Sequence, residues 1–142
     1  TAVALSTIQA SDFDAVFLPG GFGAAKNLST FAVSGTEGTV DPQVRRVLHD
    51  FHQAGKPIGA VCISPAVVVL ALQTGGVTIG ADEGTAGAIE QMGGNHTVCP
   101  VTEMHIDKEN NLVTAPAYML DASMADVAQG IDKAVHAVLE LA

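Results

Sequence analysis

The sequence predicts an α/β fold in which a mostly parallel sheet is covered by helices on both sides. Short, almost wholly apolar runs at 14–19 and 58–62 are typical of strands that are buried on both faces of such a sheet. Segments with helical periodicity alternate with these runs, and turns marked by glycine or proline separate them. With 142 residues, 48% of them hydrophobic and 15% charged, the chain suits one domain, 1–142.

The first predicted strand is Asp14–Pro19, which ends at a pair of glycines. A helix is predicted next: Asp41 is a good N-cap, Pro42 suits the first helical position, and Gly55 ends the helix. Its buried stripe is expected to consist of Val44, Val47, Leu48 and Phe51.

The next predicted strand, Ile58–Cys62, leads into a helix that begins at Ser64 and Pro65 and continues to Leu72. Glycines at 75 and 76 stop this helix. Beyond it the pattern predicts a short strand Val77–Ala81, a helix Thr85–Met92, a strand His96–Val101, a hairpin of Glu103–Asp107 with Leu112–Ala115, and a terminal amphipathic helix Ser123–Leu141.

Ligands of such sheets bind beyond the carboxyl ends of the strands. Two turns at these ends have room for a ligand, namely Gly20–Lys26 and Cys62–Ser64. We expect the strands that precede these turns to be adjacent and parallel, with Gly21 facing Cys62 at their carboxyl ends.

Charge and cysteine content exclude several classes of partner. The net charge is −9, of which residues 1–62 contribute −1 and residues 63–142 contribute −8. Six scattered Lys and Arg residues do not form the basic surface that nucleic acid or an anionic membrane needs, so neither partner is expected. Cys62 and Cys99 fit no zinc spacing, and a domain this apolar needs no disulfide. We expect a reducing compartment, no metal and no cofactor.

Cys62 stands at the junction of a buried strand and a helix, where its thiol would point into the crevice. The free N–H groups and the dipole at a helix start favour a thiolate. Ala60 and Ser64, two residues before and two residues after Cys62, are small, as a nucleophile elbow requires. Two interpretations stay open here: a nucleophilic or redox-active thiol, and a cysteine buried in the core.

The loop Gly20–Asn27 matches neither the Walker A motif nor the dinucleotide fingerprint, so it does not predict nucleotide binding. Its N–H groups could hold an oxyanion beside a nucleophile, and the alternative is a tight turn without a ligand. His96 is the candidate base, because it follows two glycines and opens a strand. His49, His52 and His136 fall on helices, where solvated side chains are expected.

Four parts of the sequence, Phe17–Leu28, His52–Gly59, Cys62 and Val113–Tyr118, resemble the ElbB-type proteins, also called sigma cross-reacting or enhancing-lycopene-biosynthesis proteins. These belong to the PfpI-like, class I glutamine-amidotransferase-like superfamily, and the resemblance runs over essentially the whole chain. It implies a flavodoxin-like three-layer α/β/α sandwich, a homodimer, and a cytoplasmic location, or a mitochondrial one in a eukaryote.

The resemblance also implies roles for single residues. Cys62 is then the reactive elbow cysteine, and the N–H groups of Gly21 and Ile63 form the oxyanion hole. His96 falls near the place of the superfamily's histidine, although ElbB-type members lack the full Cys-His-Glu triad. The pocket is expected to include Gly20, Phe22, Ser64 and Tyr118.

Family members begin with a further strand-helix-strand passage, whose first strand supplies an acid that hydrogen-bonds the cysteine. This chain begins after that region, so the resemblance implies an N-terminally incomplete domain that lacks the first passage and the acid partner of Cys62.

Two functional hypotheses follow. The first is a cysteine-dependent enzyme that acts on small reactive carbonyl compounds, a glyoxalase-like lyase or hydrolase with an elbow thiolate. The second is a non-catalytic amidotransferase-like protein, redox-sensing or ligand-binding, linked to isoprenoid metabolism. A glutaminase subunit serving a synthase is disfavoured, because the triad is incomplete.

Overall fold

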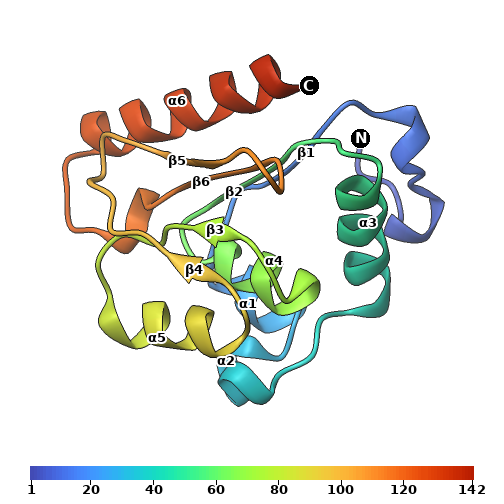
Figure 1. The fold of residues 1–142 in the computed structure, drawn as a ribbon, viewed down its shortest axis with the longest axis horizontal. Helices are drawn as coiled ribbons and strands as arrows, with labels where there is room; N and C mark the ends of the chain where they lie inside the picture. The colour runs from blue at the N-terminus through green and yellow to red at the C-terminus, as the bar shows by residue number, and fades with distance from the viewer.

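The computed structural model describes residues 1–142 and has a central sheet between layers of helices (Figure 1). The main sheet has four strands in the order β1-β2-β6-β5, and these are β1 (Val16–Leu18), β2 (Ile58–Val61), β6 (Leu112–Ala115) and β5 (His105–Asp107). A second, two-stranded parallel sheet pairs β3 (Gly76–Val77) with β4 (Asn95–His96). The predicted flavodoxin-like α/β class is confirmed.

Six α-helices surround these sheets: α1 (Phe22–Asn27), α2 (Phe31–Ser34), α3 (Pro42–Gln53), α4 (Ser64–Leu72), α5 (Glu83–Gln91) and α6 (Met124–Leu141). Figure 1 shows α6 along one face of the main sheet, with α3 and α4 on the opposite face. No helix is long and apolar enough to cross a membrane.

The strand pairing agrees with the sequence prediction. The first two strands are parallel neighbours, with Val16 opposite Ile58. The predicted hairpin is also present, because β5 and β6 pair antiparallel with Ile106 opposite Val113. The mostly parallel sheet therefore has a single antiparallel edge strand, β5.

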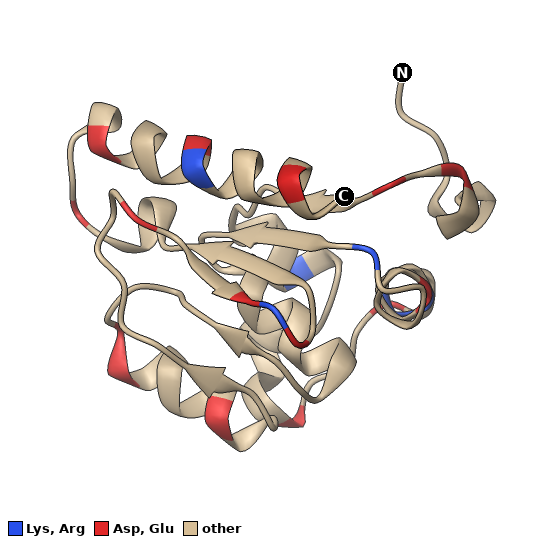
Figure 2. Ribbon diagram, turned by 45° about the horizontal axis from the view of Figure 1, so that its top comes forward, with Lys and Arg blue, Asp and Glu red and all other residues tan.

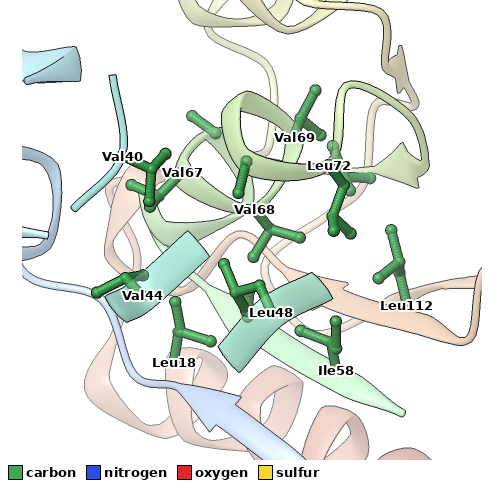
Figure 3. Close-up of a cluster of buried hydrophobic side chains, with 14 of the residues drawn as sticks. Leu18, Val40, Val44, Leu48, Ile58, Val67, Val68, Val69, Leu72 and Leu112 are labelled. Atoms are coloured by element: carbon green, nitrogen blue, oxygen red, sulfur yellow. The ribbon is translucent and has the colours of Figure 1, made fainter. Parts of the chain in front are cut away.

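Alternate residues of β2 enter two separate cores. Ile58 and Ala60 belong to the larger core, which lies between the sheet and α3 with α4, whereas Val61 belongs to the smaller core under α6. Figure 3 shows side chains of the larger core, with Leu48 of α3 and Val68 of α4 directed toward the sheet. The predicted stripe of α3 is buried as expected: Val44, Val47, Leu48 and Phe51 are each at most 5% exposed.

Two predicted strands are shorter than expected. The segments predicted at 77–81 and 96–101 pair only over 76–77 and 95–96. Side chains satisfy the backbone beyond that point: Thr114 Oγ1 accepts from the N–H of Thr78, and Thr78 Oγ1 accepts from that of Gly80. Because these N–H groups already have partners, no strand ladder is needed to satisfy them.

The region between β1 and α3 contains two short helices that the sequence pattern does not predict. Helix α1 begins after Gly21, whose φ is +87°, and contains two further small residues on its buried side, Ala24 and Ala25. Glycine and alanine in such a short segment give no amphipathic pattern, so the segment was expected to be a loop.

The first 13 residues pass beside α3 and are held there by two cationic side chains (Figure 1). Arg46 donates to the backbone oxygen of Leu5 over 2.8 Å. Lys56 Nζ donates to the backbone oxygens of Ala10 and Phe13, each over 2.7 Å. Ile8 and Ala10 of this segment also pack against the larger core, so polar and apolar contacts together hold it in place.

Candidate functional site

The backbone at Cys62 is held in a left-handed conformation, with φ of +61°. A residue other than glycine in this region costs about 1–3 kcal/mol, and it persists only where the surrounding structure imposes it. Here Cys62 follows β2 directly, its N–H donates to the oxygen of Ala115 on β6 over 3.1 Å, and α4 begins two residues later. This geometry matches the expected nucleophile elbow.

Gly20 lies against this elbow. A Cβ atom at Gly20 would lie 2.7 Å from Cβ of Cys62 and 2.9 Å from the oxygen of Val61, and φ of Gly20 is +94°. Only glycine fits such a position. The two turns therefore lie side by side at the carboxyl ends of β1 and β2, which confirms the expected proximity of these turns.

The N–H groups of Gly21 and Ile63 donate to no backbone or side-chain acceptor. Each residue precedes the first turn of a helix, Gly21 before α1 and Ile63 before α4. The N–H of Cys62 itself is occupied by Ala115. Two donors of the elbow region are thus available to an oxyanion, and their assignment to an oxyanion hole stays a prediction.

Cys62 is partly exposed and opens into a hollow of about 300 Å³. The lining comes from α1, α2, the elbow and the turn after β6, and all of it is apolar. It consists of Phe22, Ala25, Phe31, Ala32, Cys62, Ile63 and Met119. The hollow therefore presents one thiol in a hydrophobic setting.

A second hollow, of about 480 Å³, lies on the other side of Gly20, between β1, α1 and α3. Ser64 lines this hollow at the start of α4; its hydroxyl is fully buried and has no hydrogen-bond partner. Of the predicted pocket residues, Phe22 therefore lines the Cys62 hollow, whereas Gly20 and Ser64 line its neighbour.

Met119, and not the predicted Tyr118, lines the Cys62 hollow. Tyr118 is 67% exposed and lines a different hollow against α6, while Met119 lines the Cys62 hollow. The turn begins with Ala117, whose backbone is left-handed with φ of +47°. This backbone conformation accompanies the placement of Met119, rather than Tyr118, at the Cys62 hollow. No local pattern of polar or apolar residues signals such a backbone change, so Met119 could not be singled out.

His96 lies on β4, half-buried, and is not among the residues that line the Cys62 hollow. Its Nε2 accepts from the N–H of Ile79 over 3.2 Å, so the neutral ring carries its proton on Nδ1. Burial lowers the pKa of His96, Glu90 opposes this, and His105 lowers it further. A catalytic role for His96 stays a prediction.

Cys99, the other cysteine, is buried, and its Sγ contacts the oxygen of Pro100 at 3.6 Å. Burial raises the pKa of the Cys99 thiol, Glu103 adds to the increase, and Lys133 opposes it. Both cysteines are free. No group of three or more His, Cys, Asp or Glu side chains is placed so that it could hold a metal ion.

Charged side chains gather away from the Cys62 hollow. Figure 2 shows acidic residues along α5 and α6 and in the 107–109 turn, with few basic residues. Neither Lys26 of α1 nor any other charged residue lines the hollow. The negative charge of the second half therefore lies on solvent-facing surfaces.

Comparison with known proteins gives consistent matches over nearly the whole chain. The family model described as DJ-1/PfpI family matches residues 2–125. The Homo sapiens protein named glutamine amidotransferase-like class 1 domain-containing protein 3, mitochondrial, is 45% identical over 146 residues, which cover 96% of this chain and 54% of that protein. The Danio rerio ES1 protein, mitochondrial, is 34% identical over 127 residues, which cover 81% of this chain and 47% of that protein. The chain thus spans about half the length of these relatives.

Two solved structures show the same fold. An isoprenoid biosynthesis protein with amidotransferase-like domain from Ehrlichia chaffeensis has a TM-score of 0.87 and 36% identity, and the match covers 96% of this chain and 63% of that one. Drosophila melanogaster DJ-1beta has a TM-score of 0.57 and 20% identity, with 97% and 66% covered. At that identity the second likeness concerns the fold alone.

Proposed function

The chain belongs to the DJ-1/PfpI family, and from this premise we propose that it is a cysteine-dependent enzyme acting on small reactive carbonyl compounds, with Cys62 as the nucleophile. The observation that carries the proposal is the left-handed backbone of Cys62 at the start of α4, with its side chain at an open hollow. The thiol is free and partly exposed, so a substrate in the hollow can reach it.

The proposed substrate class is a 2-oxoaldehyde such as glyoxal or methylglyoxal. The Cys62 thiolate adds to the aldehyde carbon: a sulfur–carbon bond forms, and the π electrons of the carbonyl move to its oxygen. The free N–H groups of Gly21 and Ile63 are the proposed donors to this oxyanion.

A hydride then moves from the former aldehyde carbon to the neighbouring carbonyl carbon, which gives a thioester of Cys62. Water hydrolyses this thioester, the thiol is regenerated, and a 2-hydroxy acid leaves. The net reaction adds one water to the substrate, so no external oxidant or reductant is required. His96 remains the candidate proton carrier, in the role that the sequence proposes.

The direct test is turnover of glyoxal and methylglyoxal, measured as the 2-hydroxy acid formed. We expect Cys62→Ser to lose the activity, because serine is not ionised at neutral pH, and Cys99→Ala to keep it. Equal product formation by wild type and Cys62→Ser would refute the proposal.

The second candidate is a redox-sensing or ligand-binding protein linked to isoprenoid metabolism. It is favoured by the absence of His96 from the Cys62 hollow and by the name of the Ehrlichia relative. In that case peroxide should oxidise Cys62 reversibly, without any aldehyde turnover, as peptide mass analysis would detect.

We further propose membership of the ElbB type and, for a eukaryotic source, a mitochondrial location, supported by the names of the relatives.

A further inference from the structure

We infer that the Cys62 hollow selects uncharged 2-oxoaldehydes that carry a bulky apolar group, aryl or branched alkyl, and that Phe22, Ala32 and Met119 determine this specificity. The inference rests on the proposed function, because it names the substrate class of the same site.

Three separate parts of the chain build the apolar walls of the hollow. Phe22 comes from α1, Phe31 comes from α2, and Met119 comes from the turn after β6. Phe22 is 73% exposed and therefore stands at the rim. Two aromatic rings and a thioether form favourable contacts with an aryl group, and none of them offers a hydrogen bond to a small polar molecule.

The volume of the hollow supports a substituent larger than methyl. At about 300 Å³ it lies at the lower end of the range for ligand pockets, which is ~300–1,000 Å³. Glyoxal and methylglyoxal would leave most of this apolar surface in contact with water, whereas a phenyl group would cover it.

The lining also predicts which substrates are rejected. No charged or hydrogen-bonding side chain except the Cys62 thiol lines the hollow. A carboxylate bound there would lose its hydration without gaining a partner. 4-Carboxyphenylglyoxal, which keeps the 2-oxoaldehyde group but carries a carboxylate on its ring, should therefore be a poor substrate.

The first experiment compares kcat/KM for phenylglyoxal, methylglyoxal and 4-carboxyphenylglyoxal with the wild-type chain. We expect phenylglyoxal to exceed methylglyoxal on the order of tenfold to a hundredfold, since apolar pockets discriminate by about this factor per small apolar group. Ala32→Leu fills the hollow and should reduce the ratio of kcat/KM for phenylglyoxal to kcat/KM for methylglyoxal. Val33→Leu is the matched control, because Val33 is the next residue, is 85% exposed and does not line the hollow.

The second experiment is independent of turnover. Methyl and benzyl methanethiosulfonate each form a disulfide with Cys62 and release methanesulfinate, and their rates are divided by those for free glutathione. After this division, we expect the benzyl reagent to react with Cys62 about tenfold faster than the methyl reagent in the wild type and in Val33→Leu. We expect this difference to disappear in Ala32→Leu and Phe22→Ala.

The outcomes separate the two proposals. A benzyl preference without turnover of any aldehyde would refute the proposed function and keep the apolar selectivity of the hollow. Turnover of methylglyoxal without any phenyl or benzyl preference would overturn the present inference and keep the proposed function. Use of 4-carboxyphenylglyoxal as efficient as that of phenylglyoxal would also overturn it.

Discussion

Cys62 and Cys99 differ in the two properties that decide thiol reactivity. Cys62 is partly exposed at a helix start, whereas Cys99 is buried and its thiol pKa is raised by burial. A buried thiol is shielded from the reagent, and a raised pKa leaves less of it as the reactive thiolate. We therefore expect a limiting amount of iodoacetamide at neutral pH to label Cys62 many times faster than Cys99, as peptide mapping would show. Equal labelling would remove the basis for a special thiol at 62.

The backbone of the elbow can be tested at two adjacent glycines. Both have positive φ, but a Cβ at Gly20 meets Cys62 and Val61, whereas a Cβ at Gly21 meets nothing within 4 Å. We expect Gly20→Ala to lower the free energy of unfolding by about 3 kcal/mol, and Gly21→Ala by about 1 kcal/mol, in urea denaturation. A similar loss at both positions would mean that the contact with Cys62 is unimportant.

His96 makes stability depend on pH. Burial lowers its pKa in the folded state below the usual 6.5, so the unfolded chain binds the proton more readily. The stability that the neutral ring provides is present above pH 6.5 and is lost as the pH falls through the folded-state pKa. We expect the urea concentration at the unfolding midpoint to decrease as the pH is lowered from 7.5 to 5.5. We expect a smaller decrease in His96→Gln. An unchanged pH profile in this variant would contradict the assignment.

The sequence predicted the structural setting of Cys62 better than the residues around it. Cys62 was identifiable because a buried strand and a proline-started helix flank it directly, and both elements are present. The apolar walls were not identifiable, because Phe31 lies on a four-residue helix without a periodic pattern and Met119 is positioned by the left-handed Ala117. Local patterns predict elements, whereas the lining of a hollow depends on how distant elements pack.

At the scale of the elements, two helical glycines should respond oppositely to alanine. A Cβ at Gly130 of α6 would overlap the backbone oxygen of Val101 and would lie 3.3 Å from that of Glu103, whereas a Cβ at Gly87 of α5 meets nothing within 4 Å. Alanine is favoured over glycine in a helix by about 1 kcal/mol. We expect Gly87→Ala to stabilise the chain by up to that amount, and Gly130→Ala to destabilise it by about 2 kcal/mol. Thermal unfolding measures both, and stabilisation by both would show that α6 moves freely over the 101–103 loop.

The main elements were predictable because their signals are local. Asp41 accepts from the N–H groups of Gln43 and Val44, as its position before Pro42 suggested, and the buried run at 58–61 forms the central strand. The strands predicted at 77–81 and 96–101 were too long, because side chains such as Thr114 take over the backbone hydrogen bonds there. Such long-range partners leave no mark in the local sequence.

At the scale of the whole molecule, the outer edge of β1 is unpaired. The N–H of Val16 donates toward β2, so alternation along the strand directs the N–H and C=O of Phe17 to the free side. Apolar hollows of about 480 and 250 Å³ lie on the two faces of this edge. An unpaired, flat and apolar edge invites another strand.

We therefore propose that the 142-residue chain self-associates, and we retain the homodimer as the proposed form. Sedimentation velocity should show a concentration-dependent dimer or larger species, and Ala15→Lys should shift it toward the monomer, because Ala15 immediately precedes the edge strand β1 and a charge beside an edge strand opposes pairing. A monomer at every concentration in the wild type would contradict this.

The position of β2 between β1 and β6 has a further consequence for the elbow. All four of its residues are buried, and both helical layers pack on them. We expect amides in such a strand to exchange with solvent only when the whole domain opens, so that β2 shows the slowest hydrogen exchange in the molecule. The N–H of Cys62 extends this protected ladder by one bond, to Ala115. Cys62 is thus anchored to the strand that we expect to open last, while α1, α2 and the 117–119 turn, which line its hollow, lie outside the sheet.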